Sequence, residues 1–262
     1  MESWITYLPS LALSLFRPLG VITFLPLLSA RSLGGALIRN ALVLTIILPL
    51  IPLNVEQAPV GLENLNLLLQ CYGKELFIGL LIGFATAVPF WALDVASFII
   101  DTMRGASMGT LLNPLLGEQS SIYGMLFSQL YATLFLGFGG FHQLLTTLYA
   151  SYQLLVPGQT ITLDHTLFLF LKQLWLLMFQ LGMGFALPSM LIMLLIDIAM
   201  GLLNRSAQQL NVFFLAMPIK SALVLLLLVV SLGSALQLYR QHTFAIPEQL
   251  LQLLSQLGSR HE

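Results

Sequence analysis

The sequence predicts an all-α, polytopic membrane protein, and three observations lead to this prediction. Hydrophobic residues fill 58% of the 262 positions and charged residues only 8%, whereas about a quarter of an ordinary soluble domain is charged. The mean hydropathy is +0.91. The apolar residues also gather into about six segments, with no long polar stretch between them. A single bundle of membrane helices explains this pattern better than one or two soluble domains.

In chain order, the segments lie near residues 8–30, 40–53, 75–100, 122–150, 166–200 and 211–239. A membrane-spanning helix needs about 20 predominantly apolar residues, and several segments fit that requirement poorly. Three of them contain helix-breaking residues: Pro49 and Pro52, then Pro89, then Gly182, Gly184 and Pro188. Because proline removes a backbone donor, we predict broken helices whose freed carbonyls need partners in neighbouring helices or in water.

Two pairs of glycines indicate places where helix backbones approach closely. Gly79 and Gly83 form one pair, and Gly105 and Gly109 form the other. This small-xxx-small spacing is typical of tight helix contacts in membranes. Glycine is also common in membrane helices for other reasons, and that alternative stays open. Neither pair identifies the helix that packs against it.

Two polar islands interrupt the apolar chain: "DVASFIIDTMRGASMGTLLNP" at 94–114 and "LLNRSAQQLNVFFLAMPIKS" at 202–221. Ionisable groups within a membrane are costly and mark either a working site or a buried ion pair. In the first island, Asp94, Asp101 and Arg104 fall near one face of a helix. We therefore predict an ion pair between Asp101 and Arg104.

The charged side chains in and beside the islands balance one another, since three are acidic and three are basic. They are Asp94, Asp101, Asp197, Arg104, Arg205 and Lys220. Two interpretations stay open. In one, these groups pair within the chain and fix the register of its helices. In the other, some of them line a wet passage or grip partner subunits, together with the amides Asn113, Asn204, Gln208, Gln209 and Asn211.

Several function classes are excluded by the same sequence. A net charge of −1 provides no basic surface for nucleic acid. The lone Cys71 and the four histidines have no metal-ligand spacing, so neither a metal nor a cofactor is expected. No zinc-protease, serine-nucleophile or phosphate-binding motif is present. We therefore predict a protein that is not an enzyme.

Five motifs carry a resemblance to a known family. They are "RPLG" at 17–20, "LGGALIRN" at 33–40, "PFWALD" at 89–94, "DTMRGASMGTLLNP" at 101–114 and "LLNRSAQQLNVFFLAMPIKS" at 202–221. In this order and over nearly the whole chain, the sequence resembles the T subunits of the type III secretion export apparatus, whose flagellar counterpart is FliR. Gln208 departs from the pattern, because many members of the family have proline there.

The resemblance implies a fold, a location and a set of partners. The T subunit winds with the R and S subunits into a spiral, gated entrance to the secretion channel, through which unfolded secreted proteins pass. Its helices are broken, tilted hairpins in a multi-pass protein of the bacterial inner membrane, and the assembled complex is raised toward the periplasm. The U switch subunit, the needle-complex base, the inner rod and membrane lipid are the further partners implied.

The polar and small residues of the islands are then the implied subunit contacts or channel lining. This set comprises Asp101, Arg104, Gly105, Gly109, Asn113, Pro114, Asp197, Asn204, Arg205, Gln209, Asn211, Pro218 and Lys220. Arg104 and Arg205 are expected to form charge pairs, and Lys220 to neutralise an acidic partner. Gly105 and Gly109 are expected to permit close packing. Asn113, Gln209 and Asn211 are expected to cap broken helices.

The C-terminal tail is predicted to be distinct from the rest of the chain. We expect an export-gate domain over residues 1–239 and an amphipathic tail over 240–262. Within the tail, a separate helix over about 248–257 has an apolar face of leucines, namely Leu250, Leu251, Leu253, Leu254 and Leu257. Such a helix suits docking to the U subunit or to the membrane surface.

A second function from another class stays open. The chain could be a stand-alone secondary transporter of a small solute, with Asp94 or Asp197 coupling transport to protons. Such a transporter should move its solute when it is purified and reconstituted alone. An export-gate subunit should instead be inert alone and should co-purify with its R and S partners.

Overall fold

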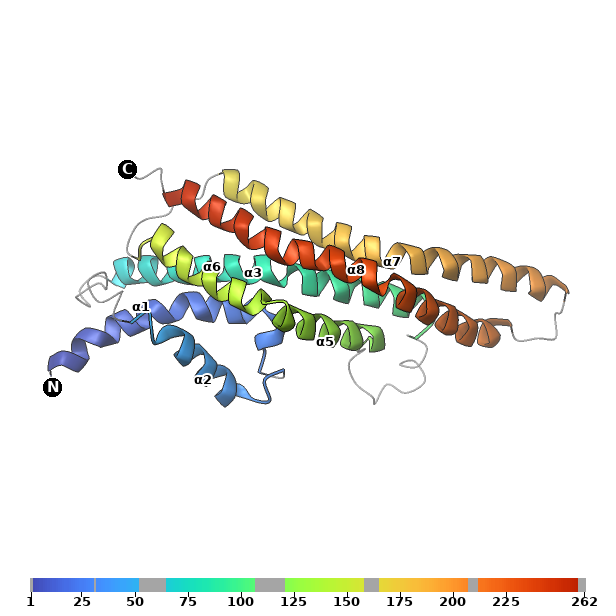
Figure 1. Cartoon of the computed structure of the whole chain (residues 1–262), viewed down its shortest axis with the longest axis horizontal. Helices are drawn as coiled ribbons and strands as arrows, with labels where there is room; N and C mark the ends of the chain where they lie inside the picture. The colour runs from blue at the N-terminus through green and yellow to red at the C-terminus, as the bar shows by residue number, and fades with distance from the viewer. Residues whose placement is uncertain are drawn as a thin grey trace. The chain divides into compact units, whose positions relative to one another are not determined.

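The computed structural model describes residues 2–30, 32–51, 65–106, 121–157, 165–206 and 212–258 (Figure 1). Every regular element in these ranges is a helix, which confirms the all-α prediction. In chain order the elements are α1 (Glu2–Phe24), the short 3-10 helix η1 (Pro26–Leu28), α2 (Ala36–Ile47), α3 (Leu65–Met103), α5 (Ile122–Gly137), α6 (Gly140–Leu154), α7 (His165–Ser206) and α8 (Val212–Gly258).

Three of the described helices are long and apolar enough to cross a membrane. They are Gln70–Met103 in α3, His165–Ser206 in α7 and Phe214–Gly258 in α8. A fourth crossing results if α5 and α6 together form one interrupted span. The described apolar parts of α1 and α2 are shorter. The chain is therefore a membrane protein, and its described residues contain fewer full-length spans than the sequence has apolar segments.

Two of the long helices continue through the prolines that were expected to break them. α3 runs through Pro89, and α7 runs through Pro188, so the predicted breaks at these positions are wrong. A proline removes only one hydrogen bond of the ladder, and tertiary packing can hold the turns on either side. Around Pro89 this packing is tight, because Val88 and Phe90 are fully buried.

A break does occur inside the apolar segment 122–150, for which sequence analysis names no helix-breaking residue. Gly139 has a φ of +83° and separates α5 from α6. Glycine adopts this left-handed conformation without the steric cost of a side chain. The segment therefore folds as two consecutive helices.

The chain forms two compact units, and each is assembled from segments that lie far apart in the sequence. Unit 1 consists of Met1–Val88, Leu136–Leu174 and Thr243–Glu262. Unit 2 consists of Pro89–Phe135 and Trp175–His242. The helices α3, α7 and α8 each contribute residues to both units.

In unit 1, α1 packs directly against the first half of α3, and this contact identifies the partner of the Gly79–Gly83 pair. A Cβ atom at Gly79 would overlap the backbone oxygen of Arg17, and one at Gly83 would lie 2.7 Å from that of Val21. α1 contributes Gly20, where a Cβ would lie 2.6 Å from the α3 backbone. Small residues on both helices permit this approach, so the predicted close contact is confirmed.

Aromatic side chains from four helices form the core of unit 2. The ring of Phe90 on α3 lies 4.5 Å from that of Tyr131 on α5, and Phe127 on α5 lies 5.1 Å from Phe185 on α7. Tyr239 on α8 lies 5.8 Å from Tyr131, all measured between ring centroids. These edge-to-face contacts hold together the helices that carry both polar islands.

The predicted separate helix at 248–257 is wrong, because α8 is continuous from Val212 to Gly258. Four of the five leucines assigned to its apolar face are buried within the chain: Leu250, Leu253, Leu254 and Leu257. That face is therefore covered by unit 1 and is not free to dock elsewhere. The predicted domain boundary at residue 240 falls inside α8, and the division itself stays a prediction.

Candidate functional site

The first polar island begins at the C-terminus of α3, where Gly105 ends the helix. Gly105 has a φ of +90°. Its N–H donates to the carbonyl of Thr102 at 3.1 Å, and the N–H of Ala106 donates to the carbonyl of Asp101 at 3.0 Å. These two bonds form a Schellman motif, which closes a helix with glycine just beyond its last turn. Gly105 therefore ends α3, and a Cβ there would lie 3.0 Å from Met217 Cε on α8. The predicted pair of Gly105 with Gly109 stays a prediction, because Gly109 lies outside the described residues.

Asp101, on the last turn of α3, organises a cluster of four residues in unit 2. Its carboxylate accepts a hydrogen bond from Arg104 Nε at 2.6 Å, which confirms the predicted ion pair. The same carboxylate accepts hydrogen bonds from the hydroxyl of Ser121 and, at 3.3 Å, from the N–H of Tyr123. The Arg104 guanidinium also lies 4.4 Å from the centroid of the Tyr123 ring, within cation–π range.

This cluster joins the end of α3 to the start of α5. Ser121 caps α5, because its hydroxyl oxygen accepts the N–H of Gly124 at 2.8 Å. The carboxylate of Asp101 lies at the same helix N-terminus, where the macrodipole favours negative charge. One buried acidic side chain thus contacts both the end of α3 and the start of α5, the two elements on either side of residues 107–120.

Lys220 of α8 forms the second charged contact of unit 2. Its Nζ lies 2.5 Å from Asp197 Oδ1 on α7 and donates to the carbonyl of Met103 at 3.2 Å. That carbonyl belongs to the last turn of α3, where the helix dipole favours a cation. Lys220 therefore finds its acidic partner within its own chain and links α3, α7 and α8. The lysine side chain is 11% exposed, whereas that of Asp197 is 49% exposed.

The remaining predicted site residues divide into exposed ones and ones outside the described residues. Asn204, Arg205 and Pro218 are exposed at the adjoining ends of α7 and α8. Within the described ranges no ion pair is recorded for Arg205. Gly109, Asn113, Pro114, Gln209 and Asn211, together with Gln208, lie outside the described residues.

Unit 1 contains a buried polar cluster that sequence analysis does not predict. Arg17 of α1 and Glu75 of α3 are both completely buried and form an ion pair. Arg17 also donates to the hydroxyl of Ser151 at 3.1 Å and to the carbonyl of Leu155. Its guanidinium lies 4.1 Å from the centroid of the Tyr152 ring. The cluster thereby ties α1, α3 and the end of α6 together.

A second cation completes this cluster. Lys74 Nζ lies 3.2 Å from Glu75 Oε1 and donates to the carbonyl of Val156 at 3.1 Å. Arg17 and Lys74 thus both reach carbonyls just beyond the C-terminus of α6, where the helix dipole favours positive charge. The sequence signals for the site were an arginine, which begins the "RPLG" motif, and a glutamate, both within apolar segments. Their spacing of 58 residues gives no indication that they meet.

Asp94 differs from the other acidic residues of unit 2. Its carboxylate accepts a hydrogen bond from the hydroxyl of Ser128 on α5 at 2.8 Å. Asp94 is exposed, and within the described ranges no cation pairs with it. An aspartate at the centre of a membrane helix costs about 2.5–3.5 kcal/mol on insertion scales. The described residues therefore do not account for its position within the apolar span of α3.

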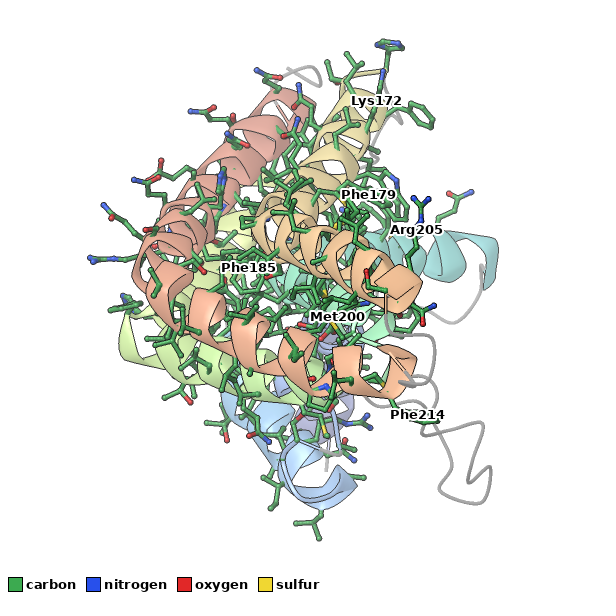
Figure 2. All side chains as sticks on the ribbon, turned by 90° about the vertical axis from the view of Figure 1, so that its right-hand side faces the viewer. Lys172, Phe179, Phe185, Met200, Arg205 and Phe214 are labelled. Atoms are coloured by element: carbon green, nitrogen blue, oxygen red, sulfur yellow. The ribbon has the colours of Figure 1, made fainter. Side chains whose placement is uncertain are left out.

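The hairpin of α7 and α8 in unit 2 exposes a large apolar surface. Figure 2 shows Met200 between the two helices and Arg205 and Phe214 near their adjoining ends. Ile196, Met200 and Ala216 form the buried contact between them. In the most apolar stretch of each helix, only 28% of the residues of α7 and 22% of those of α8 are buried, against 67% of those of α3.

The described sites consist of contacts that hold helices together. No group of three or more metal-ligating side chains is found among the residues that the structure describes. In the Asp101, Lys220 and Arg17 clusters the charged groups are joined to one another and to backbone carbonyls. These clusters fix the positions of helices, and the exposed apolar surface and Asp94 are available for contacts with other molecules.

Comparison with known proteins gives consistent matches over most of the chain. The family described as bacterial export proteins, family 1, matches residues 8–246. The secretion system apparatus protein SsaT of Salmonella typhimurium is 44% identical over 236 residues, which cover 89% of this chain and 90% of that protein. The Yop proteins translocation protein T of Yersinia pestis is 39% identical over 232 residues, with 85% and 86% covered. The flagellar biosynthetic protein FliR of Escherichia coli is 31% identical over 221 residues, with 83% and 82% covered.

Proposed function

Because this chain belongs to family 1 of the bacterial export proteins and to the T subunits of the type III export apparatus, we propose that it is one wall of the export gate. With the R and S subunits it forms the inner-membrane entrance to the channel for unfolded secreted proteins. The U subunit, the needle-complex base and the inner rod adjoin this gate, which is raised toward the periplasm.

The single observation that carries this proposal is the uncovered surface of α7 and α8. In the isolated chain, only 28% of the residues in the most apolar stretch of α7 and 22% of those in α8 are buried. Most of this stretch is therefore uncovered in both helices. A helix that is apolar on several sides needs lipid or other helices around it. Sibling subunits explain the surface and also the exposed polar residues beside it, Asn204 and Arg205, which lipid would not favour.

The predicted site residues take different roles within this proposal. Asp101, Arg104, Gly105 and Lys220 hold the ends of α3, α5, α7 and α8 in place, so that they position the gate-forming surfaces. Asp197, half exposed, pairs with Lys220 and also reaches the surface. Asn204, Arg205 and Pro218 supply direct subunit contacts. Gly109, Asn113, Pro114, Gln209 and Asn211 keep the channel-lining or contact roles that the family resemblance implies.

Co-expression with the R and S subunits tests the proposal. We expect the three proteins to co-purify, and the mass of the intact complex, measured by native mass spectrometry, should include this chain. The same chain reconstituted alone in lipid vesicles should show no proton-coupled solute flux. A well-behaved monomer with such flux would instead favour the stand-alone transporter, in which Asp94 or Asp197 carries the proton.

A further inference from the structure

The packing of α3 against α5 in unit 2 creates a surface around Asp94 that the contacts described above do not cover. We call it the Asp94 face and define it by Asp94, Phe98, Met125, Leu126 and Gln129. The three apolar members are each about half exposed, at 53%, 51% and 52% for Phe98, Met125 and Leu126. Asp94 and Gln129 are exposed as well. The face is therefore an apolar surface with a carboxylate and an amide in it.

The geometry of the two helices places these residues on one side. α3 and α5 are antiparallel, since Asp101 contacts Tyr123, Asp94 contacts Ser128 and Phe90 contacts Tyr131. At 3.6 residues per turn, Phe98 follows Asp94 around α3 in the same rotational sense in which Met125, Leu126 and Gln129 follow Ser128 around α5. Because the two helices run in opposite directions, this rotation turns both sets of exposed residues toward the same side of the helix pair. They therefore form one continuous face.

Asp94 is also the acidic group of unit 2 whose charge the described chain does not balance. Asp101 pairs with Arg104, and Asp197 pairs with Lys220. Among the described residues, the polar contact that Asp94 receives is a hydroxyl hydrogen bond from Ser128. A single neutral donor leaves most of the acceptor capacity of a carboxylate unused.

We propose that the Asp94 face is a docking site for a lysine or arginine side chain of a neighbouring subunit of the export apparatus. The inference rests on the proposed function, because it requires such a neighbour. Charge complementarity selects the occupant. Lipid chains cannot stabilise an ionised carboxylate, whereas a cationic side chain at short range forms an ion pair with it. The surrounding Phe98, Met125 and Leu126 exclude water, which strengthens the pair. The hydrogen bond from Ser128 restrains the position of the carboxylate.

Three variants in the complex co-purified with R and S subunits test this assignment. Asp94→Asn removes the charge but keeps the shape, and it should lower the fraction of chain recovered in the complex by about tenfold or more. Asp94→Glu, which keeps the charge, should retain a larger fraction than Asp94→Asn. Glu248→Gln removes an exposed carboxylate of α8 outside the face and should assemble like the wild type. Native mass spectrometry and a salt titration of the complex measure all three.

A charge reversal identifies the partner and guards against a folding defect. Asp94→Lys should fail to assemble, and replacing one lysine or arginine of an R or S subunit with glutamate should restore the complex. Membrane levels of each variant expressed without partners should equal the wild type.

If Asp94→Asn and Asp94→Lys assemble like the wild type, the docking site does not exist, whether or not secretion changes, and an aqueous lining position is the remaining role. Failure of the wild-type chain itself to co-purify would overturn the proposed function instead.

Discussion

At the scale of single residues, this apolar chain neutralises most of its buried charges by pairing them. Arg17–Glu75 joins α1 to α3, Lys220–Asp197 joins α8 to α7, and Arg104–Asp101 closes the end of α3. A buried ion pair adds little stability over an apolar pair of the same shape, but losing one partner strands a charge. The pairs therefore act mainly by making one arrangement of helices far more favourable than others.

The Arg17–Glu75 pair provides a direct test of this view. Glu75→Gln alone should lower the free energy of unfolding by about 3–5 kcal/mol, because it leaves the buried Arg17 without its acidic partner. Arg17→Met alone should cost less, because Lys74 still contacts Glu75. The double variant Arg17→Met/Glu75→Leu should lose much less than the sum of the single losses. Chemical unfolding of the detergent-purified protein, arranged as a double-mutant cycle, measures the coupling. Losses that simply add would show that the two side chains do not act as a pair.

The Lys220–Asp197 pair predicts an asymmetry that follows from unequal burial. Asp197→Asn leaves an ammonium that is 11% exposed, whereas Lys220→Met leaves a carboxylate that is 49% exposed. A stranded buried charge costs more than a stranded exposed one, so Asp197→Asn should lower the thermal unfolding temperature more than Lys220→Met. The opposite order, measured on the same detergent-solubilised preparation, would show that the carbonyl of Met103 is sufficient to hold the lysine.

At the scale of elements, glycines decide where helices end and where they cross. Gly105 ends α3 through a left-handed residue, and Gly139 separates α5 from α6 in the same way. Gly20, Gly79 and Gly83 have another role, since they let α1 and α3 approach until their backbones touch. One residue type thus serves two physical purposes, and the sequence spacing alone does not distinguish them.

Two glycines of α3 form a matched pair for testing the crossing. Gly79→Ala would place a methyl group against the backbone oxygen of Arg17, whereas a Cβ at Gly73 meets nothing within 4 Å. Gly79→Ala should therefore cost about 1–3 kcal/mol of unfolding free energy or more, and it should also disturb the nearby Arg17 cluster. Gly73→Ala should be neutral or gain up to about 1 kcal/mol through helix propensity. Equal effects in a denaturant titration would refute the close crossing.

At the scale of the whole molecule, the chain is two units that share three long helices. The C-terminal part of α8 belongs to unit 1, together with the N-terminal helix α1. Gly258 lies so close to α6 that a Cβ there would be 2.7 Å from the carbonyl oxygen of Leu154. The last turns of α8 therefore pack in the same unit as α1.

This arrangement predicts that the last turns of α8 are part of the folded core of unit 1. Leu254→Asp places a charge at a position that is 1% exposed, and it should destabilise the protein by more than about 3 kcal/mol. Ser255→Asp, at the exposed neighbouring position, should change stability by less than about 0.5 kcal/mol. Limited proteolysis of membranes should show faster cleavage within 65–88 and 140–154 for Leu254→Asp only. Equal protection of both variants would mean that the tail is an independent appendage.

Much of the local structure could be predicted from the sequence, because local structure depends on nearby residues. Composition identified a helical membrane protein, and the apolar segments lie on the helices that the structure contains. The Asp101–Arg104 pair followed from a spacing of three residues, which places two side chains on one helix face. The Gly79–Gly83 contact followed from its spacing in the same way. Helix breaks were less predictable, because α3 and α7 continue through their prolines while Gly139 interrupts the segment between them.

What the sequence by itself determined, then, is the helical class, the membrane setting and the contacts between near neighbours in the chain. Only the tertiary structure decided that Arg17 meets Glu75, that Lys220 meets Asp197, and that Asp94 is left with a serine. The physical reason is that a charge accepts any opposite charge within reach, so its partner depends on which helices become neighbours. That choice depends on packing over whole helix faces, which no short motif contains.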